Sequence, residues 1–188
     1  MKIAVYSGSF NPLHVGHRSI ISHLTQKMDF DMVYLVVSPK NPLKDSISAD
    51  SALERYEAAR EAVARCGLRA RADDIELHMP APQYTVRTLD ALKAREPDND
   101  FTLVIGADNL SIIHNWKDYR RIISEYGIVV FPRAGFDSAE LRQRLEAEFG
   151  AEGLPCRIMI ADAPLVNVSS TEIRKGMAAG MDMSGLLI

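Results

Sequence analysis

Two histidines near the N-terminus lie beside glycines, at the start of an apolar helical pattern. The stretch is YSGSFNPLHVGHRSIISHL, and its histidines are His14 and His17. Free N–H groups and the dipole at a helix N-terminus bind anions, and imidazole N–H groups add further donors. We therefore expect the loop to bind a phosphate-bearing ligand through both rings. The residues expected to expose their backbone to that ligand are Gly8, Ser9, Phe10 and Gly16.

Two other interpretations of these histidines stay open from the residues alone. They could share a metal ion, but no Cys, Asp or Glu lies nearby to complete a tetrahedral zinc site. His23, His78 and His114 would then have to converge from elsewhere in the chain. They could also be capping or core histidines. The two common nucleotide fingerprints, GxxxxGK[ST] and GxGxxG, are absent from the loop.

The composition is that of an ordinary globular protein. The chain has 188 residues, of which 47% are hydrophobic and 25% charged, and its formal net charge is −3. This charge argues against general affinity for nucleic acid or anionic membranes, so an anionic ligand must be held locally. The sequence shows neither a signal peptide nor a membrane-spanning apolar run. We expect one cytoplasmic domain covering residues 1–188.

Short β-branched runs alternate with helical patterns along the chain. The expected strands are residues 2–7, 32–38, about 68–77, 101–106, 127–131 and 156–161. Ile20, Ile21, Leu24 and Met28 mark the apolar stripe of one expected helix, and another is expected over 116–125 after an Asn115 cap. The alternation predicts an α/β fold, Rossmann-like, with three layers (α/β/α) and a mostly parallel sheet. Ligands in such sheets bind beyond the carboxyl ends of strands.

Two motifs resemble the signatures of the nucleotidyltransferase superfamily. Residues 8–17, GSFNPLHVGH, are similar to the pattern GxFxPxHxGH, and residues 168–174, VSSTEIR, are similar to (I/V)SSTxIR. The motifs stand in the expected order, near opposite ends of the chain. Together they are much more specific than either one alone.

The middle of the chain narrows the resemblance to the nicotinate-nucleotide adenylyltransferase family. The matching segments are PKNPLK at 39–44, QYTV at 83–86, IGAD at 105–108, and Trp116. The resemblance covers about residues 1–176. The chain departs from the family at Asn11, where aspartate is usual, at Gln83 and at Arg87. After Arg174 the family usually continues through a longer stretch than GMDMSGLLI.

The resemblance implies an enzyme of NAD biosynthesis that transfers AMP from ATP to nicotinic acid mononucleotide and releases pyrophosphate. The implied catalytic residues are His14, His17 and Arg174. The ATP site would add Gly106, Asp108, Ser169, Ser170 and Thr171 to the four loop residues named above. The implied acceptor site consists of Lys44, Tyr84, Thr85, Trp116 and Arg133. Mg²⁺ is expected on the ATP phosphates and not in a protein cage.

Several of these residues also have a structural interpretation. Ser169 and Glu172 fit a helix capping box. Trp116 fits a core position because of its large apolar surface, and Lys44 and Arg133 fit solvated surface positions.

Three alternatives to the main functional hypothesis stay open. The acceptor could be nicotinamide mononucleotide or phosphopantetheine, or the chain could be a nucleotide-binding module without turnover. The carboxylate of nicotinate and the amide of nicotinamide differ at one position, where an acceptor replaces a donor. The side chains named do not decide which of the two the ring site prefers. Besides ATP and the acceptor, the one further partner considered is a second copy of the chain in a homo-oligomer. We expect binding neither to nucleic acid nor to a membrane.

Overall fold

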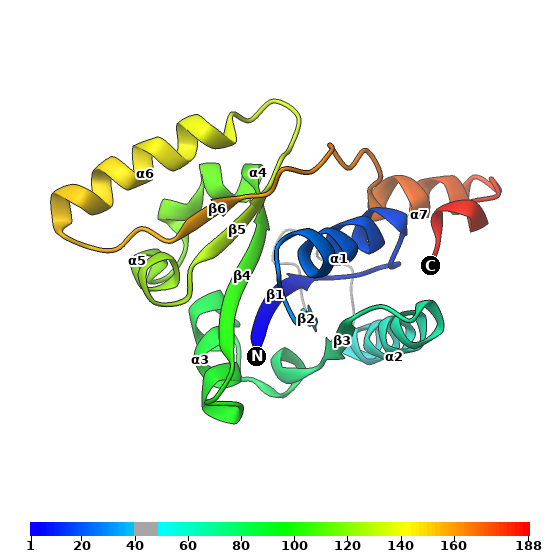
Figure 1. The fold of residues 1–188 in the computed structure, drawn as a ribbon. Helices are drawn as coiled ribbons and strands as arrows, with labels where there is room; N and C mark the ends of the chain where they lie inside the picture. The colour runs from blue at the N-terminus through cyan, green and yellow to red at the C-terminus, as the bar shows by residue number, and fades with distance from the viewer. Residues whose placement is uncertain (40–48) are drawn as a thin grey trace. The chain divides into compact units, whose positions relative to one another are not determined.

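A computed structural model describes residues 1–39 and 49–188, with side chains from Ala52 onward in the second range. Figure 1 shows the order of the elements along the chain. The predicted acceptor residue Lys44 lies outside the described residues.

Within the described residues, six strands form one sheet. They are β1 (Lys2–Gly8), β2 (Met32–Val37), β3 (Ala70–Asp73), β4 (Asp100–Gly106), β5 (Ile128–Phe131) and β6 (Ile158–Ile160). Their order in the sheet is β3-β2-β1-β4-β5-β6, which is the strand order of the Rossmann fold. The pairs β1–β4, β2–β3, β4–β5 and β5–β6 are parallel. The prediction of a Rossmann-like α/β fold is confirmed.

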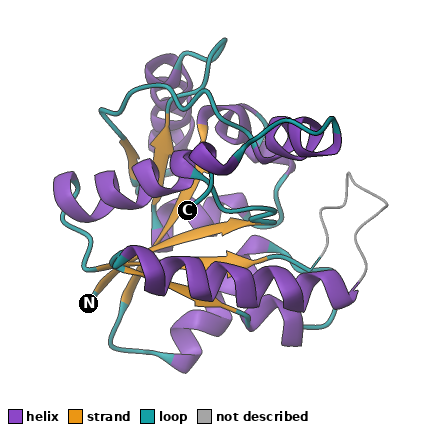
Figure 2. Ribbon diagram, turned by 90° about the vertical axis from the view of Figure 1, so that its right-hand side faces the viewer, coloured by secondary structure: helices purple, strands orange, loops and turns teal. Residues whose placement is uncertain are grey.

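Helices alternate with these strands along the chain. Figure 2 draws the helices in purple and the strands in orange. They are α1 (Val15–Lys27), α2 (Ala49–Cys66), α3 (Thr85–Arg95), α4 (Ala107–Ser111), α5 (Tyr119–Arg121), α6 (Ser138–Glu152) and α7 (Ser170–Ala178). Short 3-10 helices cover η1 (Ile75–His78), η2 (Ile113–Asn115) and η4 (Ser184–Leu186), and η3 (Ile122–Tyr126) is a π-helix. No described helix combines the length and apolar character that a membrane crossing requires.

The chain divides into two compact units. Unit 1 consists of Met1–Tyr6 and Pro80–Val166, and unit 2 of Ser7–Met79 and Asn167–Ile188. Each unit combines segments that are distant in sequence. The expectation of one domain over residues 1–188 stays a prediction.

Each unit has an apolar core built from its own strands and helices. In unit 1, β5 is buried throughout, and Leu89 and Leu92 of α3 and Phe149 of α6 are fully buried. In unit 2, Val33–Val37 of β2 are buried with the predicted stripe of α1, of which Ile20, Ile21 and Leu24 are buried and Met28 half-buried. Such unbroken apolar strands are typical of parallel sheets covered on both faces.

Two expected elements differ from the structure for local reasons. The strand expected over 68–77 ends at Asp73, because the Asp73 carboxylate accepts the N–H of Ile75 at 3.1 Å and turns the chain into η1. The helix expected to start at Trp116 starts at Tyr119. Asp118 has φ of 52°, a left-handed conformation that a continuous helix does not allow.

Helix α6 is absent from the sequence-based expectations. Its signals were local: the Asp137 carboxylate accepts the N–H of Glu140 at 2.9 Å as an N-cap, and Gly153 ends the helix with φ of 69°. Both are common helix boundary signals.

Candidate active site

His14 and His17, in unit 2, cap the first turn of α1 reciprocally. The backbone N–H of Gly16 donates to Nδ1 of His14 at 3.2 Å, and the backbone N–H of His14 donates to Nδ1 of His17 at 3.2 Å. The two rings lie 3.8 Å apart, centroid to centroid. The capping interpretation of these residues is therefore confirmed as a structural role. The N–H of Gly16, expected to face a phosphate, is engaged by His14.

These hydrogen bonds fix the tautomer of the neutral rings. An Nδ1 atom that accepts a hydrogen bond carries no proton, so in the neutral ring the proton sits on Nε2. His14 is 4% exposed and His17 half-buried. The first turn of α1 contains no acidic residue that would offset the positive end of the helix dipole. The capped turn can therefore offer imidazole N–H donors to an anion.

Phe10 shapes the loop that precedes this turn. It has φ of 43°, an uncommon backbone conformation for a bulky residue, and its side chain is 4% exposed. Its ring lies edge-on to the His17 ring at 5.3 Å. A Cβ at Gly8 would lie 3.3 Å from two atoms of the Phe10 ring, which accounts for glycine there. The strained conformation is thus packed from both sides.

Helix α7 packs its first turns against the same loop. The Ser170 hydroxyl donates to the Pro12 carbonyl at 3.1 Å. The Arg174 guanidinium donates to the Asn11 carbonyl at 2.6 Å and to the Thr171 hydroxyl at 3.2 Å. The two sequence signatures therefore meet in unit 2. Helices α1 and α7 both begin at this loop, so two positive helix ends lie close to it.

Ser169 starts α7 through a reciprocal capping box. Its hydroxyl accepts the N–H of Glu172 at 3.2 Å, and the Glu172 carboxylate accepts the N–H of Ser169 at 3.2 Å. The capping interpretation of Ser169 and Glu172 is confirmed.

Arg55 braces the loop and was missed by the sequence analysis. This residue of α2 is only 6% exposed, and it donates to the carbonyls of Ser9 at 2.6 Å and Ser38 at 2.9 Å. It thereby ties the histidine loop to the end of β2. Burial lowers the pKa of Arg55 below its ordinary value. No local pattern reveals these contacts, because Ser9 lies 46 residues away in sequence.

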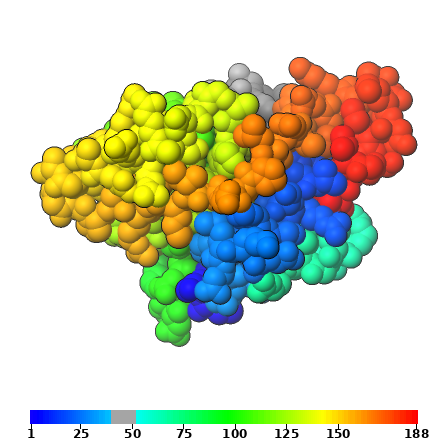
Figure 3. All heavy atoms as spheres, turned by 45° about the horizontal axis from the view of Figure 1, so that its top comes forward, coloured from blue at the N-terminus to red at the C-terminus, as the bar shows by residue number. Residues whose placement is uncertain are grey.

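A pocket of about 380 Å³ lies beside the loop in unit 2. Residues of the loop from Phe10 to Leu13 line it together with α2 and Leu187 and Ile188. Leu187 forms an antiparallel bridge with His14, and Arg65 donates to the Ile188 carbonyl at 2.8 Å. Figure 3 shows the C-terminal end of the chain, in red, next to the teal atoms of α2. The histidine loop is therefore braced on this side too.

Unit 1 holds a second group of predicted residues at the end of β4. Asp108 lies in the first turn of α4, and its carboxylate is 3.6 Å from Nε of Arg133. A Cβ at Gly106 would lie 2.3 Å from the Asp108 carboxylate and 2.8 Å from that Nε. A larger residue at this position would therefore make the Asp108 and Arg133 side chains move. Desolvation raises the pKa of Tyr6 to about 12, and Arg133 partly opposes this rise.

Three predicted acceptor residues line one pocket in unit 1. Its volume is about 200 Å³, and its walls include Tyr84, Thr85 and Trp116. Tyr84 is the N-cap of α3 and Thr85 its first residue, as expected. Trp116 follows η2 and is half-buried, so it is not a core residue. Tyr84 and Trp116 also line an adjoining pocket of about 470 Å³ together with residues 114–121.

No group of three or more metal-ligating side chains occurs within residues 1–39 and 49–188. Asp108 is paired with Arg133, and His14 and His17 are engaged through Nδ1.

Comparisons with known proteins agree on one family. Residues 5–176 match the model of a family described as Cytidylyltransferase-like. A relative from Flavobacterium johnsoniae, named probable nicotinate-nucleotide adenylyltransferase, is 34% identical over 187 residues, which are 100% of this chain and 92% of the relative. A relative of the same name from Bacteroides fragilis is 36% identical, over 97% of this chain and 85% of the relative.

A solved structure supports the fold independently. Nicotinic acid mononucleotide adenylyltransferase of Plasmodium falciparum, complexed with NaAD, superimposes with a TM-score of 0.74. The alignment covers 97% of this chain and 87% of that chain, with 18% sequence identity. At this identity the match concerns the fold alone.

Proposed function

The chain belongs to the nicotinate-nucleotide adenylyltransferase family, and on this premise we propose that it transfers AMP from ATP to nicotinic acid mononucleotide. The observation that carries the proposal is the meeting of the two signatures in unit 2. Ser170 and Arg174 hold the carbonyls of Pro12 and Asn11, which lie 158 and 163 residues away in sequence. A loop braced in this way is suited to hold a triphosphate in one orientation.

The reaction needs no deprotonating side chain. A phosphate monoester is already anionic near neutral pH. One of its oxygens forms a bond to the α-phosphorus of ATP while the bond from that phosphorus to the bridging oxygen breaks, and pyrophosphate leaves with that electron pair. Positioning of the reactants and stabilisation of the charge developing on the phosphates then supply most of the rate.

His14 and His17 stabilise the triphosphate in this proposal. Their Nδ1 atoms accept backbone N–H groups, so the Nε2–H groups are the ring donors suited to phosphate oxygens. The N-termini of α1 and α7 add favourable dipoles at the same loop. Gly8, Ser9 and Phe10 set the path of the loop. Ser169, Ser170 and Thr171 bring the start of α7 to the phosphates.

Arg174 has two functions in the proposal. It fixes the loop through the Asn11 carbonyl, and its cationic guanidinium adds positive charge for the β- and γ-phosphates. In unit 1, Gly106 and Asp108 contribute to the ATP site, and Arg133 holds Asp108 or contacts the acceptor. Asp108 acts either as an outer-shell partner of a metal ion or as a ribose contact.

Mg²⁺ is the metal we propose, carried on the ATP phosphates. This ion keeps several waters and uses substrate phosphate oxygens with few protein ligands, which fits the donor set of the described residues. When bound, it neutralises phosphate charge. The protein side chains named above orient the phosphates around it.

The pocket of Tyr84, Thr85 and Trp116 is the proposed site of the pyridine ring. The half-buried Trp116 ring offers an apolar face for stacking. The positive end of the α3 dipole, at Tyr84 and Thr85, suits a carboxylate on that ring, which favours nicotinate over nicotinamide. Lys44 is proposed as a cationic partner of substrate phosphate. A cytoplasmic location remains a prediction from the sequence.

The test is pyrophosphate release from ATP and Mg²⁺ in parallel reactions with nicotinic acid mononucleotide, nicotinamide mononucleotide and phosphopantetheine. Strong preference for the first acceptor is the expected result. Comparable rates with both pyridine mononucleotides would retain the reaction and overturn the assigned selectivity. Turnover with phosphopantetheine alone would overturn the acceptor. Binding of ATP without turnover of any acceptor would make the chain a nucleotide-binding module.

A further inference from the structure

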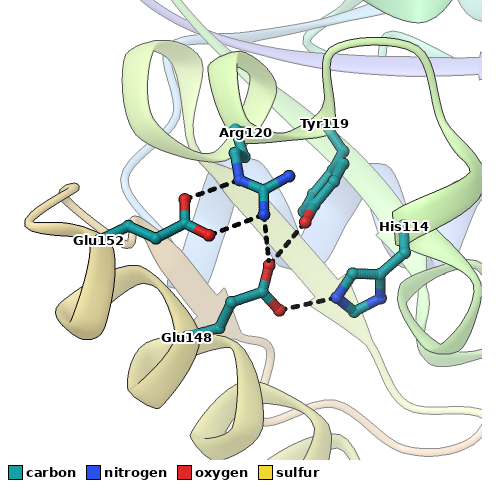
Figure 4. Close-up of polar contacts among 5 residues, drawn as sticks. All are labelled: His114, Tyr119, Arg120, Glu148 and Glu152. Atoms are coloured by element: carbon teal, nitrogen blue, oxygen red, sulfur yellow. Dashed lines mark hydrogen bonds and ion pairs between the residues drawn. The ribbon is translucent and has the colours of Figure 1, made fainter.

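The segment that carries Trp116 is held at both ends by one side chain of α6. The segment is residues 115–118, which comprise the last residue of η2 and the three residues before α5. Glu148 accepts from Nε2 of His114 at 2.8 Å and from the Tyr119 hydroxyl at 2.6 Å, using a different carboxylate oxygen for each. Figure 4 shows the Glu148 carboxylate bonded to both of these residues. One carboxylate therefore connects the residue before the segment with the residue after it.

Arg120 and Glu152 extend this clamp. Arg120 donates to Glu148 at 3.3 Å and makes two hydrogen bonds of 2.7 Å to the Glu152 carboxylate. Its guanidinium also lies over the Tyr119 ring, 4.7 Å from the centroid. The contacts thus join α5 to the last two turns of α6. Hydrogen bonds to charged groups are stronger than those between neutral groups, so the clamp is more than a single surface ion pair.

The segment has little regular structure of its own to hold Trp116. The N–H of Trp116 donates to the Ile113 carbonyl at 2.9 Å, and the N–H of Tyr119 donates to the Trp116 carbonyl at 3.3 Å. Between them, Asp118 has the left-handed φ of 52°. A strained residue of this kind keeps its conformation only where surrounding contacts fix the backbone. The contacts of Glu148 to His114 and Tyr119 lie on either side of this strained residue.

Tyr119 makes the clamp continuous with the core. Its side chain is 8% exposed, and its ring lies 6.3 Å from that of the fully buried Phe149, the neighbour of Glu148 on α6. The His114 ring lies 5.0 Å from the Tyr119 ring. Loss of the Glu148 carboxylate would therefore leave Tyr119 anchored by packing while His114 loses its partner on α6. Removal of the Glu148 carboxylate is therefore expected to change the conformation of residues 115–118 and to leave the fold of unit 1 intact.

We propose that Glu148 is a positioning residue that holds the Trp116 segment in its binding conformation and thereby sets the affinity for the pyridine ring of the acceptor. The inference rests on the proposed function, because it takes Trp116 as the ring platform. It adds a residue that contacts no substrate and acts through the 115–118 segment. Its effect should appear in acceptor affinity and not in ATP affinity.

The experiment compares the unaltered chain with Glu148→Ala, Glu148→Gln and the control Glu146→Ala. Glu146 lies on the same helix, and its hydrogen bond to Arg142 stays within α6. Steady-state kinetics would give KM and kcat for nicotinic acid mononucleotide and for ATP separately. The chain has one tryptophan, so quenching of Trp116 fluorescence by nicotinic acid mononucleotide would measure binding directly. Thermal unfolding would report the stability of each variant.

We expect Glu148→Ala to raise the KM and the fluorescence-derived Kd for nicotinic acid mononucleotide roughly tenfold, with KM for ATP changed less than about twofold. Glu148→Gln should recover part of the loss, because its amide oxygen still accepts one hydrogen bond. Glu146→Ala should match the unaltered chain. Equal KM values in all variants, or equal rises for both substrates, would overturn the inference.

Failure of the proposed function would look different. If the unaltered chain binds the mononucleotide but releases no pyrophosphate, the proposed reaction is wrong, and the fluorescence titration of the same variants still tests Glu148. If the mononucleotide does not quench Trp116 although the enzyme turns over, the ring does not bind at this segment, and the inference is overturned while the reaction stands.

Discussion

His17 accepts the backbone N–H of His14 through Nδ1, at 3.2 Å, within a reciprocal cap at the start of α1. The residue that is proposed to bind phosphate therefore also stabilises the helix start. Both functions use the same ring but different nitrogen atoms. A substitution that removes the ring changes both, so an experiment must separate them.

His17→Ala should lower turnover by about 100-fold or more, as is typical when a donor to a developing charge is removed. It should also lower the free energy of unfolding by about 1 kcal/mol, because a helix-capping hydrogen bond is lost. Pyrophosphate release and chemical denaturation measure the two effects.

His17→Gln is the matched variant, because glutamine at the third helical position can accept the capping N–H. It should recover most of the stability without recovering the turnover. Recovery of both in the glutamine variant would mean that His17 acts only as a cap.

Arg174→Lys should retain charge but lose the paired contacts to the Asn11 carbonyl and the Thr171 hydroxyl, since lysine has no planar fork of donors. We expect KM for ATP to rise and kcat to fall, each by roughly tenfold, because the loop is less well positioned. Lys175→Ala is the control, since Lys175 is exposed on the same helix. Unchanged kinetics in Arg174→Lys would show that charge alone is needed there.

The strands could be predicted from the sequence because a strand buried on both faces appears as a continuous apolar run. The predicted end of β3 and the predicted start of α5 are wrong. Asp73 ends its strand by a side-chain hydrogen bond, and Asp118 interrupts the expected helix with a left-handed conformation. A periodic pattern records neither event.

In the candidate site, too, local sequence patterns indicate some residues, and only the folded structure shows the others. His14, His17, Ser170 and Arg174 stand within motifs, so the sequence indicates them directly. The contacts of Arg55 to Ser9 and of Glu148 to His114 span 46 and 34 residues, and no local spacing predicts them. Residues that position a site from another element become visible only in the folded chain.

Gly106→Ala should separate Asp108 from Arg133, because the added Cβ would overlap both side chains. If the pair contributes to the ATP site, the KM for ATP should rise severalfold in the variant. Gly150→Ala is the matched control: no atom lies within 4 Å of its Cβ position, and it lies in helix α6. The control should raise stability by about 0.5–1 kcal/mol, since alanine favours a helix more than glycine does. An unchanged KM in Gly106→Ala would exclude the ion pair from nucleotide binding.

Stability should fall at acidic pH because carboxylates of unit 1 are paired in the folded state. Hydrogen bonds from His114 and Tyr119 lower the pKa of Glu148 below its ordinary value of 4.5. Burial alone would raise the pKa of Asp90, but hydrogen bonds from Arg121 and Tyr126 outweigh it and lower that pKa below 3.8. A lowered pKa in the folded state contributes stability at pH values above the ordinary pKa, and this contribution is lost as pH falls through the folded pKa.

The stabilisation from these two groups should therefore be fully present and constant between about pH 6 and 8, and the melting temperature should decline once pH falls below about 4.5. Glu148→Gln removes one titrating carboxylate, so the decline of its melting temperature with falling pH should be shallower. Glu146→Gln serves as the control, since Glu146 is an exposed carboxylate on the same helix whose hydrogen bond from Arg142 stays within α6. Parallel declines in Glu148→Gln and the unaltered chain would mean that protonation of Glu148 does not contribute to acid unfolding.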